Sequence, residues 1–211
     1  MTCSPEDLHH LLGNIDIYLF DQILKGRVNN LKTALDAGCG HGRNLDYFLH
    51  NDFEVFGVDE DENAIRLAQQ KASRLAPRLP LTNFRIAQLS DLPFATESFD
   101  LVICNAVLHF AANHRHFDEM FAEIWRVLQR GGLFFCRLAS KIGMESQVKQ
   151  LSKGRYLLPD GSTRYLVDEQ RLLEITQRMQ AELLDPIKTT IVQNQRCMTT
   201  WCMRKGDIGA Q

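Results

Sequence analysis

Short runs of apolar residues alternate along the chain with segments in which apolar residues recur every three or four positions. Residues 31–37 form the first run, which leads into glycines, and residues 53–58 form the second. Between them, Leu45, Phe48 and Leu49 fall at helical spacing. Runs of this length predict buried strands and spaced apolar residues predict helices that pack on them, so this region reads as strand, helix, strand.

The alternation continues through the middle of the chain. A helix is expected over residues 63–76, where Pro77 and Pro80 mark its end. Further strands are expected at three places: residues 83–89, 101–105 and 133–138. Before the last of them lies a helical stripe that stops at two glycines: Phe117, Phe121, Ile124 and Leu128, then Gly131 and Gly132. Such strand–helix alternation predicts right-handed crossovers and a parallel sheet with helices on both faces.

The tail of the chain has a different pattern. Residues 155–158 and 163–167 flank the Pro-Asp-Gly-Ser turn signal at residues 159–162, which predicts a β-hairpin. Residues 182–192 and 197–204 predict two more strands. These two should pair antiparallel, because only a short link joins them.

Two helical segments complete the expected fold. Asp168 is a suitable N-cap for a helix that turns Leu172, Ile175 and Met179 inward. Residues 7–25 carry apolar residues at helical spacings and predict a helix. The elements together predict an α/β fold with a Rossmann-like, seven-stranded, mostly parallel sheet, an antiparallel last strand and helices on both faces.

We expect the chain to divide into two parts. Residues 1–30 form an N-terminal helical segment, which either acts as a lid or packs on the sheet. Residues 31–211 form one domain with a hairpin insertion near residues 153–167. A length of 211 residues suits such a domain, and 45% hydrophobic and 24% charged residues are typical of a globular protein.

Charge and cysteine content argue against several classes of function. The net charge of −2 provides no broad positive field, so nucleic acid is not expected as a partner. The longest near-apolar run, residues 101–112, is too short to cross a bilayer, so no membrane association is expected. The six cysteines have no spacing typical of zinc or oxidoreductase sites, which predicts reduced thiols, no bound metal and a cytoplasmic location.

The strongest candidate for chemistry is the glycine-rich loop after the first strand. Gly38, Gly40 and Gly42 allow positive φ angles and a close approach of the backbone to a ligand. Asp59 ends the second strand, 21 residues after Gly38, where a carboxylate can accept hydrogen bonds from both hydroxyls of a ribose. Ligands of open α/β sheets bind at this edge, so the loop and the acid together predict a nucleoside-containing ligand.

The spacing of the glycines selects among such ligands. It differs from the Gly-x-Gly-x-x-Gly pattern of dinucleotide sites, and no Gly-Lys-Ser or Gly-Lys-Thr follows. Residues 35–44, Leu-Asp-Ala-Gly-Cys-Gly-His-Gly-Arg-Asn, resemble motif I of class I S-adenosylmethionine-dependent methyltransferases. The resemblance covers residues 33–138, about half of the chain, through three further segments: residues 57–59, residues 92–102, and residues 123–128 with the glycines at 131 and 132.

The resemblance implies S-adenosylmethionine as the cofactor, with a set of binding residues: Asp36, Gly38, Cys39, Gly40, Gly42, Asp59, Glu60, Gln88, Leu89 and Asn105. Residues 38–40 would lie along the methionine portion, and Asp36 would orient the loop and the amino group of the cofactor. Asp59 would hold the ribose and Glu60 would lie beside the adenine. The backbone of Asn105 would lie near the cofactor amino group.

One position departs from the family pattern. The family often has an Asp at the end of strand three, where it binds the adenine amino group, and this sequence has Gln88. Either the carbonyl oxygen of the Gln88 side chain or the backbone of Leu89 would then make that contact.

Candidates for the methyl acceptor side are fewer. His109 lies where its imidazole would face the transferred methyl as a base, or is a packed core histidine. Tyr18 or Asp16 would face the pocket if the N-terminal segment is a lid. Arg155 and Arg164 of the hairpin would either pair with an anionic substrate or remain solvated.

The function predicted from these features is S-adenosylmethionine-dependent methyl transfer to a small-molecule acceptor by in-line displacement. Two alternatives are a protein methyltransferase and a non-catalytic S-adenosylmethionine-binding module. The Gly-Arg-Asn at residues 42–44 also resembles tellurite-resistance methyltransferases, which leaves a metalloid or thiol acceptor open. The sequence names neither the acceptor nor an oligomeric state.

Overall fold

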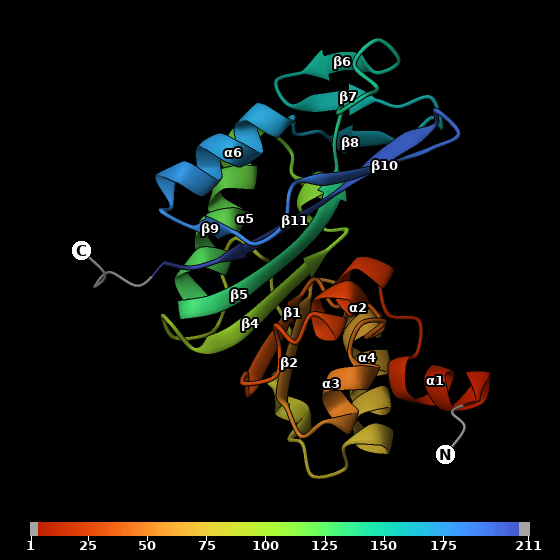
Figure 1. Cartoon of the computed structure of the whole chain (residues 1–211), viewed down its shortest axis with the longest axis vertical. Helices are drawn as coiled ribbons and strands as arrows, with labels where there is room; N and C mark the ends of the chain where they lie inside the picture. Colours follow the sequence, from red (N-terminus) through yellow and green to blue (C-terminus); the bar gives the residue numbers. More distant parts are fainter. Residues whose placement is uncertain (1–3, 207–211) are drawn as a thin grey trace.

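One mixed β-sheet carries most of the structure, which the computed structural model describes for residues 4–206 (Figure 1). Within this part of the chain, seven strands lie side by side: β1 (Thr33–Ala37), β2 (Glu54–Asp59), β3 (Phe84–Ile86), β4 (Phe99–Asn105), β5 (Leu128–Ala139), β10 (Lys188–Val192) and β11 (Arg196–Arg204). Their order is β10-β11-β5-β4-β1-β2-β3. Strands β1 to β5 are mutually parallel and β11 is antiparallel to both neighbours, which confirms the predicted sheet with an antiparallel last strand.

The single strand expected over residues 182–192 is wrong. This segment forms β9 (Glu182–Leu183) and β10, and β9 pairs with β11 as an eighth strand of the sheet in the described region. Pro186 has no backbone N–H to donate to a ladder. The Asp185 carboxylate accepts a hydrogen bond from Arg27 Nη1 at 2.5 Å instead of lying along a strand. The ladder is therefore interrupted between β9 and β10.

Helices cover both faces of the sheet, as the sequence predicts (Figure 1). They are α3 (Asp46–His50) and α4 (Glu62–Leu75) on one face, and α5 (His114–Val127) and α6 (Glu169–Arg178) on the other. Leu101 and Ile103 of β4 pack in the core beneath α3 and α4. Val102 and Cys104 alternate with them and pack in the core beneath α5 and α6, so β4 is buried on both sides.

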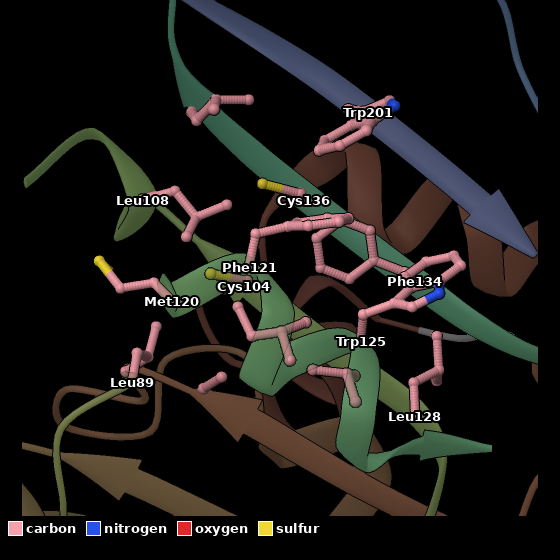
Figure 2. Close-up of a cluster of buried hydrophobic side chains, with 14 of the residues drawn as sticks. Leu89, Cys104, Leu108, Met120, Phe121, Trp125, Leu128, Phe134, Cys136 and Trp201 are labelled. Atoms are coloured by element: carbon pink, nitrogen blue, oxygen red, sulfur yellow. The ribbon is translucent and has the colours of Figure 1, made fainter. Parts of the chain in front are cut away.

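An aromatic cluster fills the core beneath α5 (Figure 2). The rings of Phe121 and Trp201 stack with centroids 5.3 Å apart, and Phe134 lies edge-on to Trp201 at 5.6 Å. The indole Nε1 of Trp201 donates a hydrogen bond to Thr176 Oγ1 at 3.0 Å. The antiparallel strand β11 is thereby attached to both α5 and α6.

The single helix expected over residues 7–25 is wrong, because the N-terminal segment forms α1 (Pro5–Leu12) and α2 (Ile17–Leu24). Gly13 ends α1 with a φ of +56°. Asp16 begins α2, where its carboxylate accepts a hydrogen bond from the backbone N–H of Tyr18 at 2.9 Å. Apolar residues recur at helical spacing on both sides of this break, so their spacing alone does not reveal it.

Two boundaries in the middle of the chain also differ. Strand β3 is shorter than the expected 83–89, and the 3₁₀-helix η1 (Leu81–Asn83) precedes it. Helix α5 ends at Val127, and β5 begins at once, because Leu128 is extended and pairs with Phe99 of β4. The 3₁₀-helix η2 (Leu108–Phe110) follows β4.

A second, small sheet follows β5. It consists of β6 (Lys149–Ser152), β7 (Arg155–Leu157) and β8 (Thr163–Tyr165), paired antiparallel in that order. The predicted hairpin is present as β7 and β8, whereas β6 was not predicted. Asp168 caps α6 as expected, accepting a hydrogen bond from the backbone N–H of Arg171 at 2.9 Å. Within residues 4–206, no helix is long and apolar enough to cross a membrane.

Candidate active site

The glycine-rich loop leaves the carboxyl end of β1 and has the backbone conformation that the sequence predicts. Gly38, Gly40 and Gly42 have φ angles of +82°, +50° and +75°. At Gly38 a second restriction applies, because a Cβ atom there would lie 2.3 Å from Cγ2 of Val107. Only glycine fits at position 38, since both the positive φ and the close neighbour exclude a side chain.

Asp59 at the end of β2 fixes this loop. Its Oδ2 accepts a hydrogen bond from the backbone N–H of Gly40 at 2.9 Å, and its Oδ1 accepts one from the N–H of Asp61 at 3.0 Å. A carboxylate has about four lone-pair sites, so Asp59 keeps acceptor capacity for a ligand.

A first cavity of about 320 Å³ opens beside Asp59, at the carboxyl ends of β1, β2 and β4. It is lined by six of the ten residues predicted to bind the cofactor: Gly38, Asp59, Glu60, Gln88, Leu89 and Asn105. The sequence did not indicate the other six lining residues: Ala87, Ala106, Val107, Phe110, His116 and Met120. The tertiary fold therefore brings predicted cofactor residues that are far apart in the sequence, from Gly38 to Asn105, to one cavity.

The four other predicted cofactor residues, Asp36, Cys39, Gly40 and Gly42, do not line this cavity. The Cys39 side chain is buried, and burial raises the pKa of its thiol well above the ordinary value, so it remains protonated and unreactive. Gly40 acts through its N–H bond to Asp59. Gly40 and Gly42 thus shape the loop rather than the surface of the cavity.

Two polar side chains near the loop are buried without a hydrogen-bond partner. They are both carboxylate oxygens of Asp36 and both amide atoms of Asn105, in the part of the chain that the structure describes. Burial raises the pKa of Asp36 to about 7, against the opposing effect of Arg43. Unpaired buried polar atoms are costly, so a site that leaves two such groups fits a polar ligand that would satisfy them.

A second cavity of about 340 Å³ adjoins the first, and Asn105 and Ala106 line both. His109 and Arg164, predicted for the acceptor side, line this second cavity. The sequence did not indicate its three other cationic residues: Arg43, Arg137 and Arg196. Together with Arg164 they come from four separate segments of the chain, so no single local motif could have revealed the set.

His109 is buried and already engaged. Its Nδ1 lies 3.2 Å from the backbone nitrogen of Ala139 and accepts that N–H. We therefore assign the ring proton to Nε2. Burial, reinforced by Arg164, lowers the pKa of His109 to about 4, so the ring is neutral at pH 7. The sequence left a base and a packed core histidine open, and the ring found here is buried with its Nδ1 already accepting a hydrogen bond.

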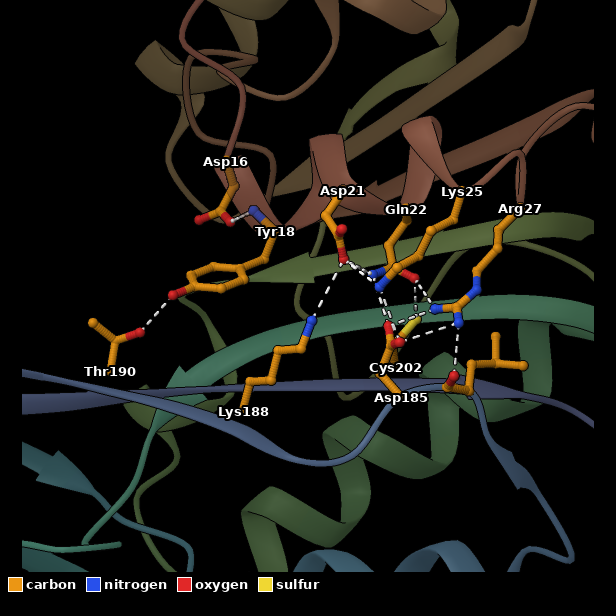
Figure 3. A network of polar contacts seen from close by, with 11 residues as sticks. Asp16, Tyr18, Asp21, Gln22, Lys25, Arg27, Asp185, Lys188, Thr190 and Cys202 are labelled. Atoms are coloured by element: carbon orange, nitrogen blue, oxygen red, sulfur yellow. Dashed lines mark hydrogen bonds and ion pairs between the residues drawn. The ribbon is translucent and has the colours of Figure 1, made fainter.

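Two of the residues predicted for the substrate or lid line neither cavity. The hydroxyl of Tyr18 lies 2.6 Å from Thr190 Oγ1 on β10, which Figure 3 shows. Arg155 donates to the backbone oxygens of Ala111 and Thr163 at 3.2 and 3.4 Å. Neither side chain lines either cavity, because each is held by these bonds elsewhere in the fold.

Asp16, the other candidate on the N-terminal segment, also lies outside the lining of both cavities. It is buried, and its Oδ2 accepts a hydrogen bond from Arg137 Nη1 at 2.9 Å. This contact ties the start of α2 to β5. Asp16 thus contacts the second cavity only indirectly, because it binds Arg137, whose side chain lines that cavity.

Ala106 is a feature that sequence reasoning missed. It follows β4 and has a φ of +65°, a left-handed conformation that is rare for residues other than glycine. Its N–H donates to the backbone oxygen of Arg137 at 2.7 Å, which holds it there. Strained residues of this kind are frequent at functional sites, and Ala106 lies in the wall between the two cavities.

Known methyltransferases resemble this chain in sequence and in fold. A family model described as a methyltransferase domain matches residues 35–136. The uncharacterised methyltransferase YodH of Bacillus subtilis (strain 168) is 32% identical over 119 residues, which are 56% of this chain and 45% of that protein. The chain thus spans less than half the length of this curated relative.

Solved structures share the fold over most of the chain. A SAM-dependent methyltransferase from Methanosarcina mazei superposes with a TM-score of 0.68 at 21% identity, covering 87% of this chain and 97% of the other. The 1,6-didemethyltoxoflavin-N1-methyltransferase of Burkholderia thailandensis, solved with 1,6-didemethyltoxoflavin and S-adenosylhomocysteine bound, superposes with a TM-score of 0.64 at 21% identity. The superposition covers 88% of this chain and 76% of the Burkholderia enzyme. At these identities the similarity establishes the fold.

Proposed function

We propose that this chain, whose residues 35–136 belong to the class I S-adenosylmethionine-dependent methyltransferase family, transfers a methyl group from S-adenosylmethionine to a small molecule. The observation that carries the proposal is the pair of adjoining cavities. The first lies at the carboxyl ends of the parallel strands beside Asp59, and the second shares a wall with it at Asn105 and Ala106. A donor and an acceptor in these cavities would meet at that wall.

The residues present suit the cofactor. Asp59 would accept hydrogen bonds from the ribose hydroxyls, with Glu60 beside the adenine. Asp36 and Asn105, whose buried polar atoms have no partner among the described residues, would satisfy the charged methionine end. Gln88 and the backbone of Leu89 remain the two candidates for the adenine amino group, since both line the first cavity.

S-adenosylmethionine, when bound, supplies a methyl group on a positively charged sulfur. The protein would therefore act chiefly by alignment and by keeping water out of the site. We assign His109 the role of donating a hydrogen bond from Nε2 to the acceptor, since its Nδ1 is occupied by the Ala139 N–H. A general base is needed only where the acceptor must lose a proton.

Both alternatives are less well supported. The second cavity, about 340 Å³ in volume, suits a small molecule better than a protein segment. A non-catalytic binding module would not require a second cavity against the first. The five described cysteines are unpaired, which supports placing the protein in the reducing cytoplasm.

Replacing Asp59 by alanine should weaken S-adenosylhomocysteine binding by about 30-fold, which corresponds to about 2 kcal/mol for hydrogen bonds to a charged group. The change removes the carboxylate that both holds Gly40 and faces the first cavity. Isothermal titration calorimetry would measure the dissociation constant.

Glu62→Ala is the matched control, because Glu62 is an exposed acid three residues further along and does not line the cavity. It should leave the affinity unchanged. Undiminished binding by the Asp59→Ala variant would contradict the cofactor assignment.

A separate assay distinguishes an enzyme from a binding module. It measures methyl uptake by small acids, amines and thiols from labelled S-adenosylmethionine.

The affinity for S-adenosylhomocysteine should also depend on pH through Asp36. Burial raises the pKa of this carboxyl to about 7, so below pH 7 the free protein holds a proton there. An ammonium group at the site favours the carboxylate, so binding releases the proton. Affinity should therefore rise about tenfold per pH unit from about pH 5.5 and level off above about pH 7.

Calorimetry in two buffers of different ionisation enthalpy would detect the released proton. The Asp36→Asn variant is the control, because it cannot titrate at this position. Its profile should be flat over the same range. An affinity of the unmodified protein that is constant, or that rises as the pH falls, would contradict the assignment of Asp36 to the ligand.

A further inference from the structure

Arginine side chains from four elements surround the second cavity. They are Arg43 after the glycine loop, Arg137 of β5, Arg164 of β8 and Arg196 of β11. The small sheet that carries β8 lies beyond the carboxyl end of β5 and beside β10 (Figure 1). Asp160 is the one acidic residue in the lining, so the formal charge of the lining is 4 − 1 = +3.

The four arginines are not equivalent. Asp16, behind the cavity, forms ion pairs with Arg137 at 2.9 Å and with Arg43 at 3.5 Å. Arg164 and Arg196 form no ion pair within the described residues 4–206. The Asp160 carboxylate of the same lining interacts electrostatically with both of them without forming an ion pair. Arg164 and Arg196 together therefore keep a formal charge of 2 − 1 = +1, and neither guanidinium is held in an ion pair in that part of the chain.

Arg164 is held in position for a ligand. Its Nη1 donates to the backbone oxygen of Thr163 at 2.9 Å, and its guanidinium lies 4.9 Å from the ring centroid of Phe110. These contacts fix the plane of the guanidinium and leave most of its five N–H groups free. Phe110 also lines the first cavity, so Arg164 is joined to the predicted cofactor side.

The rest of the lining is largely apolar. Ala139, Leu158, Val192 and Met198 contribute side chains to the same cavity. An apolar wall with a localised positive charge suits a molecule that has a hydrocarbon body and one anionic group. A nucleic acid or a long acidic peptide would instead need an extended positive surface.

We propose that the methyl acceptor is a small organic acid whose carboxylate binds between Arg164 and Arg196. The guanidinium fork matches a carboxylate in geometry and in charge. The atom that receives the methyl group lies toward Asn105 and Ala106, where the second cavity meets the first. This inference rests on the proposed methyl transfer and names its substrate class.

The test compares carboxylic acids with their uncharged isosteres. Benzoate, phenylacetate, hexanoate and related acids, each paired with its primary amide, are titrated against the full chain by ligand-observed NMR, with and without S-adenosylhomocysteine. The acids should bind at least about tenfold more tightly than the amides, as expected for a charge-assisted pair. Arg164→Gln and Arg196→Gln should each remove about this advantage and leave amide binding unchanged.

Arg155→Gln is the matched control, because Arg155 is in the same small sheet and has the same charge but lies outside the cavity lining. It should keep the full preference for acids. Equal binding of acids and amides, no binding of any acid, or an equal loss in the Arg155→Gln variant would overturn the proposal. Tighter binding of phenyl phosphate through the same two arginines would overturn the carboxylate and indicate a phosphate monoester.

Affinity for S-adenosylhomocysteine is measured in parallel on every variant. It should be unaffected by Arg196→Gln and Arg155→Gln, since neither arginine lines the first cavity. Arg164→Gln also removes the contact with Phe110, so its loss of acid binding is compared with its own affinity for S-adenosylhomocysteine. If the protein prefers acids but does not bind S-adenosylhomocysteine, the proposed anion site is supported and the proposed methyl transfer is contradicted. The two proposals can thus fail separately.

Discussion

Replacing Gly38 by alanine is expected to abolish S-adenosylhomocysteine binding, with a loss on the order of 100-fold or more. The added Cβ would lie 2.3 Å from Val107 Cγ2 and 2.9 Å from its Cγ1, so the loop or Val107 must move. Alanine at a φ of +82° also costs about 1–2 kcal/mol in backbone strain. The dissociation constant and the free energy of unfolding in urea would both be measured.

Two further variants separate the loss of binding from a loss of stability. Gly161 has the same φ of +82°, but a Cβ there would meet no atom within 4 Å. Gly161→Ala should therefore show the strain alone and bind normally. Combining Gly38→Ala with Val107→Ala removes the clashing methyl groups and should recover part of the stability, while binding stays lost. Normal binding by Gly38→Ala would show that the backbone at this position does not approach the ligand.

Replacing Asp185 by alanine is expected to lower the free energy of unfolding by about 3 kcal/mol. Its carboxylate accepts hydrogen bonds from Arg27 Nη1 at 2.5 Å, from Gln22 Nε2 at 3.0 Å and from Lys25 Nζ at 3.0 Å, as drawn in Figure 3. The side chains of Arg27 and Asp185 are only 18% and 14% exposed. Removing the acid leaves a largely buried guanidinium without its counter-ion, and this is costly.

The matched control for Asp185→Ala is Glu182→Ala. Glu182 pairs with Arg204 on the same edge of the sheet, but at 3.7 Å and with side chains 67% and 46% exposed. Exposed pairs contribute at most about 1 kcal/mol, so this variant should be nearly as stable as the unmodified protein. Equal losses in the two variants would refute the role assigned to the Asp185 cluster.

The effect at Asp185 should disappear in acid. Burial favours the protonated carboxyl, but the hydrogen bonds from Arg27, Lys25 and Gln22 outweigh it and hold the pKa of Asp185 well below its usual range. A carboxyl with a depressed pKa stabilises the folded state above its unfolded pKa of about 3.9 and loses that contribution as the pH falls. The gap between the unmodified protein and Asp185→Ala should therefore be full at pH 7 and narrow below about pH 4.

The cofactor side of the site could be predicted because its determinants are local. The positive φ angles of the loop require glycines at fixed positions, and these are visible as residue types. Asp59 follows an apolar strand of recognisable length. Parallel strands bring their carboxyl ends to one edge, so a strand order of this class implies that the loop and Asp59 meet. The hydrogen bond from Gly40 to Asp59 confirms that they do.

The edge of the sheet and the N-terminal segment could not be predicted in the same way. The break between β9 and β10 has a local signal in Pro186, which the sequence interpretation overlooked, but the contact of Asp185 with Arg27, more than 150 residues away in the chain, has none. Tyr18 or Asp16 would face the pocket if the N-terminal segment is a lid, but a partner on β10 binds the hydroxyl of Tyr18 instead. The spacing of apolar residues indicates which face of an element is buried, but it does not indicate a polar partner that is distant in the sequence.

The second cavity shows this limit most clearly. Its arginines are spread from position 43 to position 196, and of these only Arg164 was a candidate for an anionic substrate from the sequence. His109 was identified as a candidate from its place in the chain, but the donor role that we propose for it rests on the Ala139 N–H, which β5 supplies. Conformational restrictions such as those of the glycine loop are properties of single residues, so they can be predicted from the sequence. The charge of a cavity and the proton on a buried ring depend on groups that meet only when the chain has folded.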